Sequence, residues 1–338
     1  PLTFTPADWN TPKDVTVTGV DDDIIDGDVG STVPIAVDDV NSDDTYDPLP
    51  DATASVTTTD DDVAGITIVE EAGATVVAEA AGTDTYTVVL DAEPGSDVVI
   101  DVTSADTGEV TASPASLTFT TANWNTPQTV TVTGVDEAID DGDQVTVVTA
   151  AVRDISSDNA FDGESAVVSV TTLNDDTAGI SVSAISGNTS EAGDQATFTI
   201  ALDSEPLDDV TIALSSDDTS EGTVAPTSAV FTPANWNTPQ TITVTGQPDA
   251  IDDGDQAYSI ITAAASSTDP AYDGRNAGDV SVTNTDDDTR GITVSAISGS
   301  TSEPSGAATF TIVLDSEPTG DVTIGLSSTD TSEGTLAV

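Results

Sequence analysis

Residues 231–255 read FTPANWNTPQTITVTGQPDAIDDGD, and two further stretches repeat that wording. Residues 119–143 read FTTANWNTPQTVTVTGVDEAIDDGD, and residues 4–28 read FTPADWNTPKDVTVTGVDDDIIDGD. In each copy Thr alternates with apolar residues over the TVTVTG or TITVTG run, as in a strand with one buried face, and a loop rich in carboxylates follows. Self-similarity at a nearly fixed period predicts a tandem-repeat protein.

The repeat boundaries follow from two markers. Trp9 and Trp124 are 115 residues apart, and Trp124 and Trp236 are 112 residues apart. The strand starts AGITI, AGISV and RGITV each follow an acidic run. We therefore divide the chain into the C-terminal half of a repeat (1–62), two complete repeats (63–176 and 177–288) and the N-terminal half of a repeat (289–338). The half-repeats fit either a window of a longer array, which we favour, or chains that complete one another head to tail.

The strand pattern predicts the fold of each repeat. Apolar residues alternate with Thr in ATFTIAL (196–202), so that Ala196, Phe198, Ile200 and Leu202 share one face. Similar short runs are GISVS, DVTIALS (209–215), SAVFT (228–232), QTITVTG (240–246), AYSIITAA (257–264) and DVSVTNT (279–285). Seven strands without a helical period predict an all-β fold of tandem immunoglobulin-like Greek-key β-sandwiches, joined end to end as an extended array. Trp236 is expected to cover the core beside Phe231.

Composition narrows the classes of partner. The chain has 62 Asp and Glu against 4 Lys and Arg, a formal net charge of −58, so nucleic acid and anionic membranes are poor partners. A halophile-like acidic surface would give the same excess of charge. The 36% hydrophobic content, arranged in strand-length runs, argues against disorder. There is no Cys to form disulfides, and no apolar run approaches the roughly 18 residues of a membrane helix, so no membrane insertion is expected in this segment.

Acidic residues recur at four places in each repeat. The first is a Glu after the opening strand (Glu71, Glu191, Glu303), and the second is an Asp after the third strand (Asp106, Asp218, Asp330). The third is the loop after TVTVTG, with candidate ligands Asp21, Asp22, Asp26 and Asp28; Asp136, Glu137, Asp141 and Asp143; and Asp249, Asp253 and Asp255. The fourth is the run that closes each repeat: Asp60, Asp61 and Asp62; Asn174, Asp175 and Asp176; and Asp286, Asp287 and Asp288.

These four places are expected to meet in space. In a Greek-key sandwich the loops after the first, third and fifth strands lie at one end, where the seventh strand finishes. So many carboxylates would repel one another strongly without a cation, and Ca²⁺ prefers six to eight oxygen ligands. The alternative is a set of separate solvated turns, because Asp and Gly favour turns. The loop is not an EF-hand, since Ile139 and Ile251 stand at the third ligand position, and zinc is implausible without His or Cys.

The LTFT, TVTVTGVD and IDDGD wording, the early SE–G and the closing TDDD resemble Calx-β repeats, which occur in sodium–calcium exchangers and large bacterial surface proteins. NWNTPQTVTVTG is similar to tandem arrays in bacterial adhesins. The resemblance implies several Ca²⁺ ions per repeat at the end facing the next repeat. In the central repeat it implies the ligands Glu191, Asp218, Asp249, Asp253 and Asp286–Asp288, with the Ile251 carbonyl as a backbone candidate. Pro248, Asn174, Gln144 and Gln256 depart from the pattern, which puts site number and affinity in doubt.

The leading functional prediction is an extracellular or bacterial cell-surface structural protein, a calcium-rigidified array that forms a fibre, filament or adhesin stalk. Its partners would be neighbouring repeats or head-to-tail copies of itself. The alternative is an adhesive module that binds a glycan or a cell surface through exposed strand faces or loops such as STDPAYDG (267–274), although that loop recurs and fits a packing corner better. Calcium signalling is a third possibility.

Catalysis is not expected. The chain contains no His or Cys for the familiar nucleophile arrangements, and its paired carboxylates recur in every copy, which suits a structural cation better than glycoside hydrolysis. Exposed Ser and Thr could carry O-glycans, and Asn188-Thr189-Ser190 is a single N-glycosylation sequon of a kind that often occurs by chance.

Overall fold

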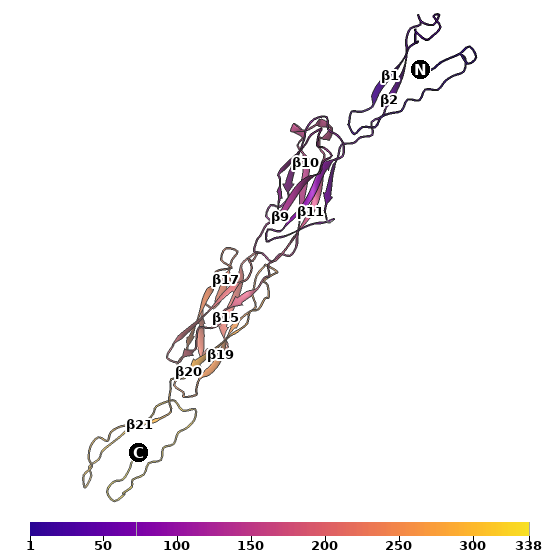
Figure 1. Ribbon diagram of the computed structural model, residues 1–338. Helices are drawn as coiled ribbons and strands as arrows, with labels where there is room; N and C mark the ends of the chain where they lie inside the picture. The colour runs from indigo at the N-terminus through magenta and orange to yellow at the C-terminus, as the bar shows by residue number, and fades with distance from the viewer. Residues whose placement is uncertain (72, 338) are drawn as a thin grey trace. The chain divides into compact units, whose positions relative to one another are not determined.

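The computed structural model describes residues 1–71 and 73–337 (Figure 1). Its residues form two compact units. The first contains Pro1–Glu137 and Gly142–Asp175, and the second contains Ala138–Asp141 and the chain from Asp176 onward. Among the described residues, no helix is long and apolar enough to cross a membrane, and the helical elements are the 3-10 turns η1 (Asp154–Ser156) and η2 (Asn159–Phe161).

The second unit contains a sandwich of two sheets. One sheet has the order β12 (Ile180–Val182), β14 (Gln195–Leu202), β18 (Gln240–Gly246) and β16 (Gly222–Ala225). The other has the order β13 (Thr189–Ser190), β20 (Val280–Thr285), β19 (Gln256–Thr262), β15 (Val210–Ser216) and β17 (Ser228–Phe231). The short pair β21 (Ile292–Val294) and β22 (Ile312–Leu314) follows.

The first unit repeats this plan. Its four-stranded sheet has the order β3 (Ile66–Glu70), β5 (Thr83–Leu90), β9 (Gln128–Gly134) and β7 (Val110–Ser113). Its five-stranded sheet has the order β4 (Thr75–Ala78), β11 (Ser165–Leu173), β10 (Gln144–Val152), β6 (Val98–Ser104) and β8 (Ser116–Phe119). The hairpin of β1 (Val29–Ile35) and β2 (Ala52–Thr58) precedes them. The all-β prediction is therefore confirmed, with immunoglobulin-like sheet orders.

The predicted alternation decides which side chains form the core. Ala196, Phe198, Ile200 and Leu202 on β14 are at most 4% exposed, while the Thr residues between them face outward. Trp236 packs against the core cluster that contains Phe231, as the sequence predicts, and Trp124 packs against the core of the first unit. Burying one face of each sheet against the other removes apolar surface from water, which is the main stabilising term for such a sandwich.

Two strands of the sandwich in the second unit, β13 and β16, lie outside the seven predicted runs. β16 is only four residues long and ends before Pro226, so it lacks a readable alternation. β13 has two residues and pairs in parallel with β20 through Thr189↔Asn284 and Ser190↔Thr285. The chain therefore starts in one sheet at β12 and crosses to the other at β13. This crossing places the residues after β13 at the end of the sandwich where β20 finishes.

Gly246 provides a test of this packing. A Cβ at Gly246 would lie 2.2 Å from the Ser190 carbonyl oxygen and 2.5 Å from Asn284 Oδ1, and backbone cannot move aside cheaply. We expect Gly246→Ala to lower the free energy of unfolding of the second unit by about 1–3 kcal/mol, the usual cost of overpacking. Scanning calorimetry measures it. Gly278→Ala, where a Cβ meets nothing within 4 Å, is the matched control and should leave the transition unchanged.

Candidate cation site

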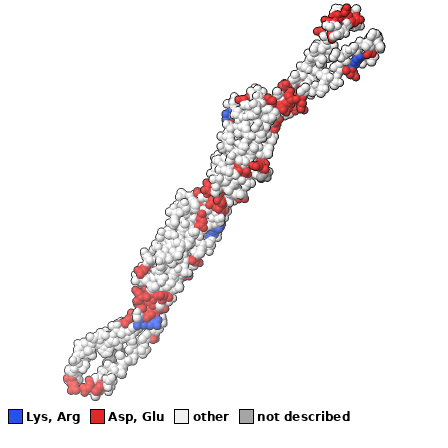
Figure 2. All heavy atoms as spheres, in the orientation of Figure 1, with Lys and Arg blue, Asp and Glu red and all other residues white. Residues whose placement is uncertain are grey.

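The acidic side chains gather in clusters on the surface instead of spreading evenly (Figure 2). In the second unit the best defined cluster contains Glu191, Asp286 and Asp288, each of which offers a carboxylate oxygen within 4.8 Å of the other two. Strand register explains the meeting. Because β13 and β20 run in parallel, Glu191 follows β13 directly beside Asp286, and its backbone N–H donates to the Thr285 carbonyl at 3.1 Å.

Glu191 is the most unusual member of this cluster. It is 4% exposed, and its Oε2 atom is buried without a hydrogen-bond partner. Burial and the nearby charges of Asp249, Asp286 and Asp288 raise the pKa of Glu191 to about 7, although the Asp287 N–H lowers it. A buried oxygen without a donor is costly, and a cation would supply the missing partner. The residues present therefore fit a hard divalent cation that accepts oxygen ligands.

The loop 249–255 is tied to the closing run by a reciprocal pair of hydrogen bonds. Gly254 N–H donates to Asp286 Oδ2 at 2.6 Å, and Asp286 N–H donates to Asp255 Oδ1 at 3.3 Å. Asp286 Oδ1 also accepts the Asp288 N–H at 2.8 Å. Burial, followed by the charges of Asp287 and Asp286, raises the pKa of Asp288. The loop and the closing run therefore form one acidic surface.

Similar hydrogen bonds join the acidic loop to the closing run in the two preceding copies of the repeat. Gly27 N–H donates to Asp60 Oδ2 at 2.7 Å, and Asp60 N–H donates to Asp28 Oδ1 at 3.2 Å. Asn174 N–H likewise donates to Asp143 Oδ1 at 3.2 Å. Burial and the charges of Asp60, Asp61, Asp23 and Asp22 raise the pKa of Asp62. The third and fourth predicted places therefore lie together in each copy.

The second predicted place has a local explanation as well. Asp218 Oδ1 accepts the Ser220 N–H at 3.0 Å and the Ser220 hydroxyl at 2.5 Å, and these bonds lower the pKa of Asp218. Asp106 caps Gly108 and Asp330 caps Ser332 in the same way. Each of these aspartates thus stabilises its own turn, which agrees with the alternative prediction of separate solvated turns. The charge of Asp218 also contributes to the raised pKa of Glu221.

Sequence reasoning missed two glutamate positions. Glu221 is half-buried, and desolvation, with the charges of Asp218, Asp253 and Asp249, raises its pKa, while Asn284 Nδ2 donates to its Oε2 at 3.4 Å. The equivalent of Glu191 in the first unit is Glu79, which is fully buried and lies within 4.8 Å, oxygen to oxygen, of Glu137 and of Asp175. The spacing could have identified it, because Glu79 precedes Leu90 by as many residues as Glu191 precedes Leu202.

Most of the remaining predicted residues are exposed, and two of them fall in a different unit from Glu79. Glu71 is exposed after β3 and belongs to none of the acidic groups found among the described residues. Asp136 is exposed, Glu303 and Asp330 are exposed in the chain after β20, and Asp141 and Asp176 belong to the second unit. Asp26 and Asp21 lie in the exposed loop before β1.

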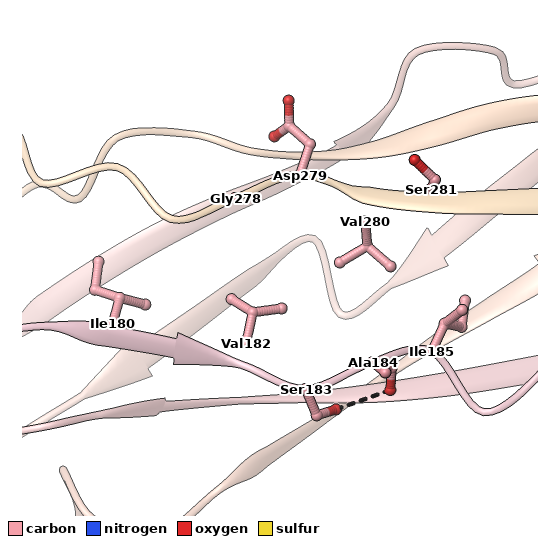
Figure 3. Close-up of a pocket in the computed structure, with 9 residues that line it drawn as sticks. All are labelled: Ile180, Val182, Ser183, Ala184, Ile185, Gly278, Asp279, Val280 and Ser281. Atoms are coloured by element: carbon pink, nitrogen blue, oxygen red, sulfur yellow. Dashed lines mark hydrogen bonds between the residues drawn. The ribbon is translucent and has the colours of Figure 1, made fainter.

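A separate groove in the second unit is lined by β12 with the residues that follow it and by the start of β20 with the residues that precede it (Figure 3). Ile180, Val182, Ile185 and Val280 line it, and its one carboxylate, Asp279, accepts the Thr262 N–H at 2.8 Å. The groove therefore presents apolar side chains and lies apart from the acidic cluster.

No protein-family model matches the chain, and no curated protein matches it. Among solved structures it is similar to CBD12 from CALX1.2, at 12% identity and a TM-score of 0.29 over 64% of this chain and 98% of that one. It is also similar to the calcium-binding domain CBD12 of CALX1.1, at 12% identity and 0.29, over 65% and 99%. Domains 5–6 of the S-layer protein SbsC match at 16% identity and 0.22, over 66% and 99%. These scores are too low to support an argument about the site.

The raised pKa of Glu191 gives a pH prediction for cation-free protein. An unfolded Glu ionises near 4.5, whereas folded Glu191 stays protonated to about 7, so its contribution to stability is greatest below pH 4.5 and is lost as the pH rises to about 7. Glu191→Gln should remove that loss, so that its melting temperature in metal-free buffer gains on the wild type across this interval. The exposed Glu71→Gln is the control. Parallel pH profiles for wild type and Glu191→Gln would contradict the assignment.

Proposed function

We propose that this chain is part of an extracellular or cell-surface structural array in which calcium bound at the acidic loops stiffens the connection between repeats. The observation that carries the proposal is the buried Glu191, which follows the parallel pair of β13 and β20, lies in one acidic group with Asp286 and Asp288, and has an Oε2 atom without a hydrogen-bond partner. Ca²⁺ suits this set, because all of its donors are carboxylate or backbone oxygens.

The donor set favours calcium over other cations. Zinc prefers nitrogen and sulfur ligands, which this chain cannot supply, since it has no His and no Cys. Magnesium demands a nearly ideal octahedron and keeps most of its water, whereas calcium tolerates irregular sets of six to eight oxygens. Glu191, Asp286 and Asp288 would supply part of such an irregular set, and Asp249 and Asp253 of the neighbouring loop are the further candidate ligands. Several ions per repeat are consistent with the further carboxylate of Glu221.

We also propose that the chain is not an enzyme. Glycosidases hold their two carboxyl groups at least about 5 Å apart to accommodate the sugar or a water. The carboxylate oxygens of Glu191, Asp286 and Asp288 all lie within 4.8 Å of one another. That spacing suits shared coordination of a cation better than division into an acid and a base.

The adhesive alternative has weaker support. In the two complete repeats the aromatic residue of the corner loop is buried, since Tyr272 and Phe161 are each 0% exposed, whereas Tyr46 in the N-terminal half-repeat is 57% exposed. Tyr272 Oη donates to the Ser204 carbonyl at 2.7 Å, so the side chain fixes the corner to the core. A glycan would have to bind the Thr-rich strand faces or the apolar groove beside Val280. A glycan array probed with calcium-loaded protein tests this second candidate.

Calcium titration by calorimetry tests the site directly. Asp288→Asn should weaken calcium binding by about tenfold or more, because it removes a charged ligand. Asp209→Asn removes the same charge from an exposed turn before β15 and should leave the affinity unchanged within about twofold. Equal affinities for the two variants would contradict the assignment of Asp288.

Stiffening is tested by small-angle scattering of this chain in millimolar calcium and then in excess chelator. We expect the maximum dimension to fall and the flexibility to rise on chelation. A calcium-bound folded state also gains stability by mass action, about 2.7 kcal/mol at a hundredfold excess over the dissociation constant. A scattering profile that chelator does not change would overturn the structural proposal and leave the acidic loops as solvated turns.

A further inference from the structure

Two segments of the chain expose apolar residues whose counterparts are buried in the second unit. Residues 1–62 correspond in sequence to 228–288, and residues 289–337 correspond to 177–225. Val15 is 63% exposed, whereas its counterpart Ile242 is 0% exposed. Phe310 is 38% exposed, whereas its counterpart Phe198 is 1% exposed. We call these surfaces the N-terminal face (Phe4, Trp9, Val15, Val17 and Tyr46) and the C-terminal face (Phe310, Val322, Ile324 and Leu326).

The counterparts of the two faces pack against each other in the second unit. β14 pairs with β18 through Phe198↔Ile242, and β15 pairs with β17 through Val210↔Phe231. All four side chains belong to one hydrophobic core. The first unit has the same two strand pairings, between β5 and β9 and between β6 and β8. The corresponding residues of the C-terminal face are Phe310 and Val322, and those of the N-terminal face are Val15 and Phe4.

A hollow of about 690 Å³ lies beside the C-terminal face. Leu314, Ser316, Pro318 and Val322 contribute to its lining, so it continues the apolar surface of that face. A hollow lined by apolar and small polar residues suits an amphipathic aromatic side chain. The counterparts of Leu314 and Ser316 in the second unit are Leu202 and Ser204.

The second unit shows which aromatic residues occupy this place. Leu202 N–H donates to the Trp236 carbonyl at 3.1 Å. The Ser204 carbonyl accepts the Tyr272 hydroxyl at 2.7 Å, and Tyr272 is fully buried. The N-terminal face carries their counterparts, Trp9 and Tyr46, which are 70% and 57% exposed. The aromatic residues of one face therefore match the hollow beside the other.

We propose that the C-terminal face of one copy of this chain binds the N-terminal face of a second copy, so that residues 289–337 and 1–62 form one composite β-sandwich. Antiparallel pairing in the register of the second unit sets Phe310 opposite Val15 and Ala308 opposite Val17. Such an interface is heterologous, so each assembly keeps one free face of each kind and continues to add copies. Burial of apolar surface drives it, and the inference therefore does not rest on the proposed role of calcium.

Sedimentation velocity of this chain over a wide range of concentrations tests the proposal. In millimolar calcium we expect the mean mass to rise with concentration in steps of one chain. A neighbouring repeat of a longer array would cover the same faces, so the measurement is made on the chain of 338 residues, in which both faces are exposed. A mass of one chain at every concentration would overturn the proposal, whether the faces stay free or close on each other within one chain.

Two charged variants test the head-to-tail arrangement. Val15→Asp disables the N-terminal face, and Ile324→Asp disables the C-terminal face, because a buried carboxylate without a partner is costly. Each variant alone should associate at least about tenfold more weakly than the wild type. A mixture of the two should form dimers and nothing larger, since one intact face of each kind remains. Recovery of association in the mixture also shows that the intact face of each variant is folded.

Gly30→Asp and Gly325→Asp are the matched controls, one in each segment. A Cβ at either position meets nothing within 4 Å, and the counterparts Ala257 and Ala213 are exposed in the second unit. These variants add the same charge outside the composite core, so their association should stay within about twofold of the wild type.

Association of either charged variant alone at wild-type strength would show that like faces pair or that the contact is unspecific, and would overturn the proposal. So would a mixture that stays monomeric. A calorimetric calcium titration of the same sample separates this failure from that of the proposed function. Calcium binding without association contradicts the composite sandwich alone, whereas association without calcium binding contradicts the proposed function alone.

Discussion

The acidic end of the second unit depends on one backbone interaction, the parallel pairing of β13 with β20. Two residue pairs, Thr189↔Asn284 and Ser190↔Thr285, fix the register. That register sets Glu191 beside Asp286 and buries it at the same time, since the sandwich closes over the strand crossing. The Thr189 hydroxyl joins Asn284 Oδ1 at 3.0 Å and Tyr258 Oη at 3.1 Å, so the short pair is fastened by buried hydrogen bonds as well as by backbone.

This register brings three carboxylates together, and their mutual repulsion is an electrostatic cost to the folded state. Each of Glu191, Asp286 and Asp288 offers a carboxylate oxygen within 4.8 Å of the other two. The guanidinium of Arg290 does not join them but donates to the carbonyl of Asp252. Carboxylates held this close either take up protons or bind a cation. Near neutral pH Glu191, whose pKa burial raises to about 7, binds more protons than it would in the unfolded chain. The site is therefore poised between a protonated state and a cation-bound state.

Much of the fold could be predicted from the sequence, because apolar residues that alternate along a strand mark the face that packs into the core of a β-sandwich. Phe198 and Ile200 are buried as their periodicity predicts, and Trp236 packs against the core that contains Phe231, as expected. The acidic site was harder to predict from the sequence. Glu79 stands in VAEAAG, where no Ser precedes it and an extra Ala follows, so motif matching selected the exposed Glu71 instead. Glu221 was missed because its role depends on Asn284 and the loop 249–255, which are distant in sequence and meet only through the sheet register.

A comparison of the two complete repeats separates what packing requires from what the acidic end requires. Gly222 and Tyr258 in the second unit correspond to Val110 and Thr146 in the first, so a small and a large residue exchange with two of intermediate size. Ser204 and Tyr272, which share a hydrogen bond at 2.9 Å, correspond to the apolar pair Ala92 and Phe161. Volume-conserving exchanges of this kind keep a core intact.

The acidic end of the two repeats shows no comparable exchange of a charged for an apolar residue at its buried position. Both repeats retain a buried glutamate after the strand crossing, Glu79 and Glu191, although an apolar side chain there would cost nothing in desolvation. Exposed positions of the loop do vary, as Pro248 against Asp136 shows. The two repeats differ in their core pairs but share a buried glutamate. Packing alone does not account for the glutamate, so a second requirement acts at that position. The cation proposed above would supply that constraint, because it would convert the buried carboxylate from a cost into a ligand.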